Sequence, residues 1–453
     1  MSEIFDPIAS AAVSLAAHRE PQFVFTDEVD VAREKLARFR ERTSRRGPNI
    51  LVILMDDVGW GDFGCYGGGV AVGAPTPNID RLARRGLLLT SCYSQPSCTP
   101  SRASLLTGRL PMRHGLHRPP MYGEPGGLHG ETTLAMLLSA LGYTTQAVGK
   151  WHLGENVASQ AQHVGFDDFY GFLSVSDMYT EWRDPHFFPE IVYSEARTDW
   201  IKNMPFNRCF VHAARGGAAE NVEEVTIPVL SRLDDIVGRL WRVLEETGQA
   251  ERTLIFLSSD NGPHMETWPD AAHTPFRCAK GSTWEGGVRV PGLLTWPGMI
   301  ESERASDGLF DFTDFLPTAL ALAGGLDTLP SDRYIDGVDQ SSFLLAPDGR
   351  SNRKYVYYWL LRRLSAIRVG EYKWILVSTS DDVADVHGAG GFTGVTQQYT
   401  YPRLYNLYLD PKETHSYLTR KLVYNEAFLD GMRDHLATFR TYPPKQTMGL
   451  KLR

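Results

Sequence analysis

Residues 96–109 contain the residue types and spacing that best suit chemistry. Cys98 is one of five cysteines in the 453-residue chain, and Arg102 follows it four residues later. Pro100 favours the first turn of a helix, which the next residues continue up to Gly108. One helical turn then separates Cys98 from Arg102 on the same face, where a cation could hold an anionic substrate. The alternative is a core cysteine beside a surface arginine, because free cysteine is often buried as a small hydrophobe.

Oxygen ligands follow two apolar stretches of the chain. The pair Asp56-Asp57 comes directly after the run 49–55, and Asp260-Asn261 follows the similar run 253–257. Carboxylate and amide oxygens are hard ligands, which suit Ca²⁺ or Mg²⁺ better than zinc. Three carboxylates held together would repel one another, so a divalent cation is their natural partner. The alternative is a set of turns or helix caps, a common use of acidic residues after a strand.

Two further stretches place cations beside glycines. Lys150 and His152 are one residue apart, so an extended segment would point both the same way. An ammonium and an imidazole together suit the binding of an anionic ester and proton transfer to oxygen. Lys280 precedes a glycine-rich turn and could reach an anion or a leaving-group oxygen; a solvated loop lysine is the alternative. Glu285 and Arg289 are expected to pair for structure alone.

The elements that must position these residues alternate between helices and strands. The runs 49–55 and 253–257 predict strands buried on both faces of a sheet, with a site at their carboxyl ends. This alternation predicts an α/β chain. We expect helices over residues 28–46, 100–107, 132–141 and 222–247, a linker or elaborate loop over 326–353, and a mobile loop over 380–397. Strands over 355–361, 366–369, 373–377 and 404–409 predict a smaller antiparallel sheet.

Composition narrows the class of protein. With 42% hydrophobic and 22% charged residues the chain reads as an ordinary globular protein. A net charge of −8 argues against binding to nucleic acid or to anionic membranes. No apolar run approaches the roughly 20 residues needed to cross a bilayer. The alanine-rich stretch 9–17 lacks a basic segment before it, and the cysteines form no CxxC pair, so we expect a cytoplasmic protein without disulfides.

Taken together, these stretches resemble the signature blocks of the sulfatase family, part of the alkaline phosphatase superfamily. The blocks occur in the family's order over most of the chain, from about residue 48 to 413, and the cysteine motif is the most specific of them. They are Asp56-Asp57, Cys98-Thr99-Pro100-Ser101-Arg102, Gly149-Lys150-Trp151-His152-Leu153-Gly154, Asp260-Asn261-Gly262, residues 280–291, and Leu404-Tyr405-Asn406-Leu407 with Asp410-Pro411-Lys412-Glu413.

The resemblance implies a fold and a division into domains. The fold would be alkaline-phosphatase-like, an α/β architecture with a large mixed sheet sandwiched by helices and a smaller C-terminal antiparallel sheet. Residues 1–47 would form an N-terminal helical extension, 48–350 the catalytic domain and 351–453 the smaller C-terminal subdomain.

The resemblance also implies hydrolysis of sulfate monoesters, with arylsulfatase-like activity. A separate maturation enzyme would oxidise Cys98 to formylglycine, whose hydrate attacks sulfur with one hydroxyl and later expels sulfate through the other. The cofactor would be Ca²⁺, with Mg²⁺ as the alternative, bound by Asp56, Asp57, Asp260, Asn261 and the modified Cys98.

The family's catalytic roles carry over to matching positions of this chain. Asp260 would help to deprotonate the nucleophile, while Arg102 and Lys150 would hold the hydrate and the charges around the metal. His152 would be the base of the elimination step. Lys280 would contact the sulfate and the departing oxygen.

The chain departs from the family pattern at a second histidine, which sulfatases usually carry in a mid-chain Pro-His pair. Residues 209–217 contain no such pair, and His212 is the nearest candidate for the acid that protonates the leaving group. Lys280 alone, His264 or His273 are the alternatives.

The organic part of the substrate is the least specified feature. Aromatic residues within 177–188 could line a pocket for an aryl group, or could simply cover the core. An aryl sulfate is the default expectation, with sugar and alkyl sulfates as alternatives. A phosphomonoester, phosphodiester or phosphonate hydrolase of the same superfamily is the alternative enzyme, and a non-catalytic binding protein is the third hypothesis.

Overall fold

The computed structural model describes residues 11–44, 47–120, 126–174, 211–217, 220–221, 230–264, 272–379, 394–417 and 425–445. The chain divides into two compact units, which are described separately: the first comprises Met1–Arg118 and Val229–Lys445, and the second Pro119–Pro228 and Gln446–Arg453. The domain boundaries at 47/48 and 350/351 stay a prediction. Across the described residues, every helix is too short or too polar to cross a bilayer.

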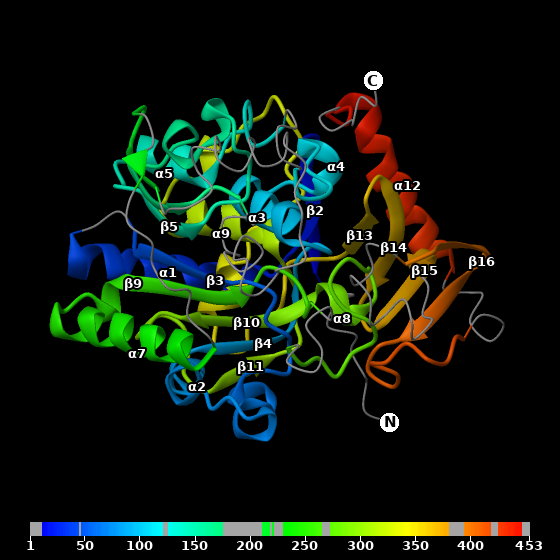
Figure 1. Cartoon of the computed structure of the whole chain (residues 1–453), viewed down its shortest axis with the longest axis horizontal. Coiled ribbons are helices and arrows are strands. Elements are labelled where there is room, and N and C mark those ends of the chain that lie inside the picture. The colour runs from blue at the N-terminus through cyan, green and yellow to red at the C-terminus, as the bar shows by residue number, and fades with distance from the viewer. Residues whose placement is uncertain are drawn as a thin grey trace, which may run out of the picture. The chain divides into compact units, whose positions relative to one another are not determined.

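The first unit holds a mixed sheet, a C-terminal sheet and their helices (Figure 1). Its elements are β1 (Ala12–Ala16), β2 (Arg19–Val24), α1 (Thr26–Thr43), β3 (Asn49–Met55), α2 (Pro77–Arg84), β4 (Leu87–Tyr93), α3 (Cys98–Thr107), α4 (Pro111–His114), α7 (Leu230–Glu246), β9 (Thr253–Ser259), α8 (Glu285–Val288), β10 (Arg289–Thr295), β11 (Arg304–Ser306), β12 (Phe310–Asp311), α9 (Phe315–Leu322), α10 (Ser341–Leu345), β13 (Val356–Leu360), β14 (Arg363–Val369), β15 (Tyr372–Thr379), β16 (Thr396–Asn406) and α12 (Asn425–Thr441).

The mixed sheet has the strand order β11-β4-β10-β9-β3, with β12 also pairing with β4. β3 and β9 are parallel, and their registers align Met55 with Ser259. Both strands therefore end at the same edge of the sheet, as predicted. β9 is buried along its whole length, whereas β3 is the last described strand of this sheet and is mostly half-buried. The prediction that both strands are buried on both faces is thus wrong for β3.

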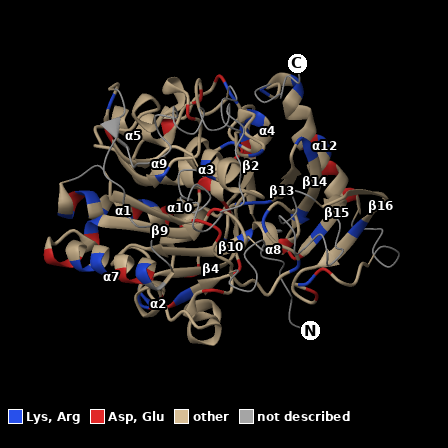
Figure 2. Cartoon of the chain, in the orientation of Figure 1, with Lys and Arg blue, Asp and Glu red and all other residues tan. Residues whose placement is uncertain are grey.

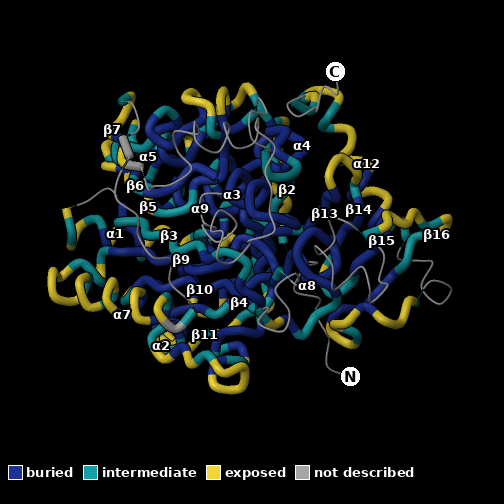
Figure 3. The backbone as a smooth tube through the Cα atoms, in the orientation of Figure 1, coloured by how far each residue is buried: buried dark blue, intermediate teal, exposed yellow. Residues whose placement is uncertain are grey.

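Helices cover the two faces of this sheet. On one face, α2 and α7 pack their apolar side chains, including Ile79 and Val237, against Ile255 and Leu257 of β9. On the other face, Phe256 stacks on Phe315 of α9, with ring centroids 5.0 Å apart. Figure 3 shows β9 and β10 as buried and much of α7 as exposed, and Figure 2 shows that α7 carries acidic and basic residues along its length. The large mixed sheet between helices confirms the predicted α/β fold.

Helix α3 confirms the helix predicted from Pro100. It begins at Cys98 and ends at Thr107, where Gly108 adopts a left-handed conformation with φ of 66°. Glycine adopts this conformation without steric cost, which explains why the helix stops there. The hydroxyl of Ser101 donates to the carbonyl of Ser97 at 2.8 Å and accepts from the backbone N–H of Gln95 at 2.9 Å. These bonds fix the chain that leads into Cys98.

The C-terminal sheet is antiparallel, with the order β13-β14-β15-β16, and confirms the predicted smaller sheet. β16 begins at Thr396, so the last residues of the predicted 380–397 loop belong to a strand; residues 380–393 lie outside the described ones. Residues 326–353 are not a simple linker. They contain α10, and Asn352 and Gln340 form buried side-chain hydrogen bonds there.

The predicted N-terminal helix is present as α1, but a β-hairpin of β1 and β2 precedes it, so residues 1–47 are not purely helical. β2 is attached to the rest of the unit through Glu20. Its backbone N–H donates to Ile335 at 3.0 Å, and its carboxylate accepts from the Tyr334 hydroxyl at 3.1 Å. Glu20 is 5% exposed, and burial, assisted by the nearby Asp336, raises its pKa to about 7.

The raised pKa of Glu20 predicts a pH-dependent stability. The folded chain holds this proton more tightly than the unfolded chain, whose carboxyl titrates near 4.5. The free energy of unfolding should therefore increase as the pH falls from about 7 towards 4.5, and this gain should be absent above pH 7. Denaturant unfolding of the wild type and Glu20→Gln at pH 7.5 and 5.5 measures it. Relative to the wild type, the free energy of unfolding of Glu20→Gln should be higher at pH 7.5 than at pH 5.5. An equal difference between variant and wild type at both pH values would contradict the assignment.

The second unit contains α5 (Leu134–Ala140), β5 (Gln146–Lys150), β6 (Asp168–Phe172), β7 (Val211–Ala214) and β8 (Glu220–Asn221). The strands form a sheet of order β5-β6-β7-β8, in which β5 and β6 are parallel and the other pairs antiparallel. Helix α5 confirms the helix predicted over residues 132–141.

Candidate active site

Three carboxylates meet at the carboxyl ends of β3 and β9; we call Asp56, Asp57 and Asp260 the acidic cluster. The backbone N–H of Asp260 donates to the carbonyl of Met55 at 3.0 Å, so the two strand ends stay paired beyond the sheet. The N–H of Asp57 donates to the carboxylate of Asp260 at 3.2 Å. Asp57 has a φ of 59°, a left-handed conformation that is uncommon for a non-glycine residue and is frequent at functional sites.

Arg102 of α3 lies against this cluster. Its Nε and Nη2 both donate to Oδ2 of Asp260, at 2.9 and 2.7 Å, and Nη2 lies 3.4 Å from Oδ1 of Asp56. The guanidinium is almost completely buried. Burial by itself would lower its pKa, but the charges of Asp260, Asp56 and Cys98 outweigh burial and raise the pKa above its usual value. Arg102 is therefore a permanent cation at the site, as the helical spacing predicted.

Lys280 reaches the cluster from the glycine-rich turn predicted for it. Its ammonium donates to both carboxylate oxygens of Asp57, at 2.8 and 2.7 Å. Burial opposes the charged form, but the surrounding acidic groups raise the pKa of this lysine. The predicted pairing of Glu285 with Arg289 is also present, at 3.6 Å.

Cys98 begins α3 at the edge of the acidic cluster and is 1% exposed. Its Sγ lies 3.8 Å from Oδ1 of Asp57. One ligand atom from Cys98 and one from each carboxylate of the cluster all lie within 4.8 Å of one another. A cysteine that merely filled the core would have apolar neighbours instead, so this position supports the functional interpretation of the motif.

The donor set fits a hard divalent cation. The three carboxylates outnumber the two cationic side chains, Arg102 and Lys280, by one negative charge. Asn261 donates through Nδ2 to Asp57 at 2.6 Å, while its Oδ1 is buried and has no hydrogen-bond partner among the described residues. A buried carbonyl oxygen without a donor is costly, and a cation beside it would remove that cost.

Lys150 and His152 belong to the second unit. β5 ends at Lys150, and the backbone N–H of His152 donates to Leu173 at 3.0 Å. His152 has a φ of 56° and is 3% exposed. The segment is therefore not extended through His152, and the alternation predicted to point the two side chains the same way does not apply.

The candidates for the leaving-group acid lie in different surroundings. His212 sits on β7 with an exposed imidazole, whose Nε2 lies 2.7 Å from Oδ1 of Asp168, opposite the start of β5. In the sheet, His212 lies opposite Tyr170 of β6, and Lys150 lies opposite Phe172, two residues further along the same strand. This contact does not favour a catalytic role, and the assignment of His212 stays a prediction. His264 is half-buried three residues after Asn261, whereas His273 is exposed.

Sequence reasoning missed charged residues behind the Lys280 turn. Lys373 and Glu413 are fully buried and form an ion pair of 2.9 Å. Lys373 lies in a strand predicted from its apolar neighbours, and a lysine within such a run was the available signal. Residues 177–188 and Cys209 lie outside the described residues.

A second group of potential ligands is formed by Glu20, Asp336 and His435, within 4.8 Å of one another. The indole N–H of Trp359 donates to Nε2 of His435 at 3.3 Å, so a neutral imidazole carries its proton on Nδ1. Arg113 already pairs with Asp336 at 3.1 Å. We therefore interpret this group as a structural contact of the N-terminal hairpin and not as a metal site.

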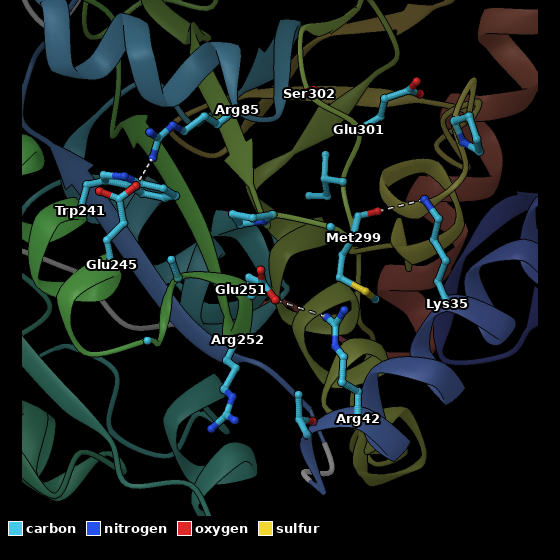
Figure 4. Close-up of a pocket in the computed structure, with 17 residues that line it drawn as sticks. Lys35, Arg42, Arg85, Trp241, Glu245, Glu251, Arg252, Met299, Glu301 and Ser302 are labelled. Atoms are coloured by element: carbon cyan, nitrogen blue, oxygen red, sulfur yellow. Dashed lines mark hydrogen bonds and ion pairs between the residues drawn. The ribbon is translucent and has the colours of Figure 1, made fainter.

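A surface cavity of about 1040 Å³ lies away from the acidic cluster, near the amino ends of β3 and β9 (Figure 4). Three of its four basic side chains have polar partners. Arg85 pairs with Glu245 at 2.9 Å, Arg42 with Glu251 at 4.0 Å, and Lys35 donates to the carbonyl of Met299 at 3.0 Å. Four basic and three acidic side chains line it, so its charge is mixed and selects no class of ligand.

Comparison with known proteins agrees with the geometry around Cys98. Residues 48–219 and 228–326 match the sulfatase family model, and residues 365–440 match a model described as the sulfatase AslA C-terminal domain. N-acetylgalactosamine-6-sulfatase of Mus musculus is 31% identical over 428 residues, covering 81% of each chain. Arylsulfatase A of Homo sapiens is 33% identical, covering 82% of this chain and 84% of that protein.

The crystal structure of PsFucS1 sulfatase from Pseudoalteromonas sp. superposes with a TM-score of 0.88 and 36% identity, covering 95% of this chain and 98% of that one. The sulfatase family model covers the mixed sheet, and the AslA C-terminal model covers most of the C-terminal sheet. The chain therefore belongs to the sulfatase family.

Proposed function

We propose that this sulfatase, a sulfuric ester hydrolase by family, uses formylglycine made from Cys98 as its nucleophile. One observation carries the proposal: Cys98 begins a helix 3.8 Å from Asp57, within a group of three carboxylates. The hydrated aldehyde supplies a hydroxyl that attacks sulfur and a second hydroxyl that allows sulfate to be released. A separate maturation enzyme would have to oxidise the thiol.

The metal would be Ca²⁺, because the donors are oxygens of carboxylates and an amide. Asp56, Asp57, Asp260, Asn261 and the formylglycine made from Cys98 would hold it, and the buried Oδ1 of Asn261, which has no hydrogen-bond partner among the described residues, supports this set. Bound there, the cation would supply charge stabilisation for the nucleophile and for the sulfuryl oxygens. Mg²⁺ is the alternative, and it demands a stricter octahedral arrangement.

The cationic side chains of the first unit would stabilise the negative charge of the reaction. Arg102 is held by two bonds to Asp260, so it presents a fixed charge one turn from Cys98. Lys280 would contact the sulfate and the departing oxygen. Asp260 would receive the proton of the nucleophile, since its carboxylate is kept in place by Arg102 and by the N–H of Asp57.

Two roles of the second unit remain proposals carried by the family motif. Lys150 would stabilise charge beside the nucleophile, and His152 would act as the base of the elimination step. For the leaving group, Lys280 and the half-buried His264 are better supported than the exposed His212, because both lie close in sequence or space to the acidic cluster.

We propose a sulfate monoester rather than a phosphate monoester as the substrate, because the matching family model and the named relatives are those of sulfatases. A sulfate monoester carries one negative charge, whereas a phosphate monoester carries about −1.5 to −2 at neutral pH. Named relatives include both an N-acetylgalactosamine-6-sulfatase and an arylsulfatase, so we propose aryl sulfate as the test substrate and sugar sulfate as the second candidate.

A matched pair of esters tests the proposal. Chain co-expressed with a formylglycine-generating enzyme should hydrolyse 4-nitrophenyl sulfate with a kcat/KM at least about tenfold above that for 4-nitrophenyl phosphate. A site matched to a sulfate ester leaves the extra charge of the phosphate ester unbalanced, which in a partly buried site costs more than about 1 kcal/mol. N-acetylgalactosamine 6-sulfate, followed by sulfate release, tests the sugar class. Faster cleavage of the phosphate ester would favour the phosphohydrolase alternative.

A further inference from the structure

Residues 277–288, which we call the Lys280 loop, connect the active site to the C-terminal sheet. On the active-site side, the backbone N–H of Gly281 donates to Pro96 at 2.6 Å, two residues before Cys98. The N–H of Lys280 donates to Pro263 at 3.0 Å, two residues after Asn261. The loop thus touches both segments that lead into the cluster, and its lysine holds Asp57.

Two charged residues of the C-terminal part of the chain hold the other side of the Lys280 loop. Figure 1 shows α8, at the end of this loop, beside the C-terminal sheet. Lys373 of β15 donates to the carbonyl of Thr283 at 2.7 Å and lies 3.0 Å from the carboxylate of Glu285. Glu413 accepts from the backbone N–H of Glu285 at 2.8 Å and pairs with Lys373 at 2.9 Å. Its own carbonyl accepts from Arg277, at the start of the loop.

These contacts are stronger than surface contacts because no solvent screens them. The side chains of Lys373, Glu285 and Glu413 are all 0% exposed. Glu285 keeps its charge there: burial would raise its pKa, but Lys373, followed by Arg289, outweighs burial and lowers the pKa to about 2. Burial raises the pKa of Glu413 to about 7, although Lys373 opposes this. Lys373 also keeps Glu285 as a second partner, so the loss of Glu413 acts through the contacts that it makes with the loop and not through an unpaired charge.

The loop has little room to absorb a displacement. A Cβ atom on Gly286 would lie 2.2 Å from the carbonyl of Cys278, and one on Gly262 would lie 1.8 Å from the carbonyl of Gly286. The backbone of the loop is thus packed closely against itself at Gly286, and only two residues separate Lys280 from Thr283. Glu413 has a φ of 52°, a costly conformation that persists only where its surroundings hold it.

We propose that the buried Lys373–Glu413 pair positions Lys280. Through this pair, the C-terminal sheet would fix the position of a cation in the active site. This inference rests on the proposed role of Lys280 in sulfate ester hydrolysis. Glu413 touches neither Cys98 nor the acidic cluster in the contacts described above, so it acts through the loop. It belongs to the Asp410-Pro411-Lys412-Glu413 block, which thereby acquires a function in catalysis.

A double-mutant cycle tests the inference. Glu413→Gln keeps the shape of the side chain and an oxygen that can accept from the backbone N–H of Glu285, but it removes the ion pair with Lys373. It should lower kcat for 4-nitrophenyl sulfate on the order of tenfold to a hundredfold, the effect of a small misplacement of a catalytic group. In a Lys280→Ala background the same change should cost less than about threefold, because residues that act through one another are not additive.

Glu28→Gln is the matched control. Glu28 is also a buried glutamate that accepts one backbone N–H and one cation, both from Arg350, but it lies on α1. We expect it to lower the unfolding midpoint and to change kcat by less than about twofold. If Glu413→Gln does not fold, Ser365→Ala replaces it, since the Ser365 hydroxyl contacts that of Thr283 and removing it leaves no buried charge.

The outcomes separate the two claims. A wild-type chain that carries the aldehyde yet leaves the sulfate ester intact would overturn the proposed function and this inference with it. If the wild type is active and Glu413→Gln or Ser365→Ala lowers kcat as much in the Lys280→Ala background as in the wild type, the inference alone is overturned. A Glu413→Gln enzyme that loses stability, like the control, but keeps its kcat would also overturn it.

Discussion

Replacing Cys98 by alanine should lower sulfate ester hydrolysis by roughly 10⁴-fold or more, because it removes the nucleophile rather than a supporting group. The remaining carboxylates and cations could still bind the ester, so KM should change far less than kcat. Cys98→Ser keeps a hydroxyl at the helix start but lacks the second oxygen that would release sulfate. It should therefore be nearly as inactive at steady state. Turnover of 4-nitrophenyl sulfate measures both variants.

The chemical state of Cys98 is checked on the same samples. In active wild-type protein, the peptide containing residue 98 should weigh about 18 Da less than the thiol form, since an aldehyde oxygen replaces sulfur and two hydrogens. Cys65→Ala is the control: burial raises the pKa of the half-buried Cys65 thiol to about 12, so it stays a thiol and its loss should leave turnover intact. Full activity in Cys98→Ala would refute the proposed nucleophile.

The parts of the site predicted from sequence are those set by local patterns. Asp56 and Asp260 follow apolar runs, and parallel pairing of the two strands brings them to one edge of the sheet. The spacing of Cys98 and Arg102 needs only one helical turn, which Pro100 and Gly108 delimit. Each of these predictions depends on a few neighbouring residues, and each is confirmed.

The parts that could not be predicted depend on contacts distant in sequence. Lys373 and Glu413 are buried where the C-terminal sheet lies against the Lys280 loop. The apolar neighbours of Lys373 indicate that it is buried, but the sequence around neither residue identifies its partner. The N-terminal hairpin depends on the pairing of Glu20 with Ile335, more than three hundred residues away along the chain. His152 leaves the extended conformation through a positive φ. Histidine adopts such a φ more often than most residues, but that preference is too weak to predict it at one position.

Removing the proposed cation should have the second largest effect. Treatment with a chelator should lower turnover by about 10²-fold to 10³-fold, because the charge that stabilises the sulfuryl oxygens is lost, and Ca²⁺ should restore it. A second readout needs no catalysis. A ligand present at about a thousand times its Kd stabilises the folded state by about 4 kcal/mol, so Ca²⁺ should raise the unfolding midpoint by a few degrees even in Cys98→Ala.

Asn261→Ala distinguishes binding at the acidic cluster from binding elsewhere. Its buried Oδ1 has no hydrogen-bond partner among the described residues, so a ligand role predicts that the Ca²⁺ concentration for a half-maximal thermal shift rises about tenfold or more. Asp234→Asn is the comparison. Asp234 accepts the backbone N–H groups of Asn78 and Ile79 at the start of α2, so its loss should lower stability while leaving the Ca²⁺ response unchanged. A Ca²⁺ response that survives in Asn261→Ala but disappears in Asp234→Asn would place the cation outside the cluster.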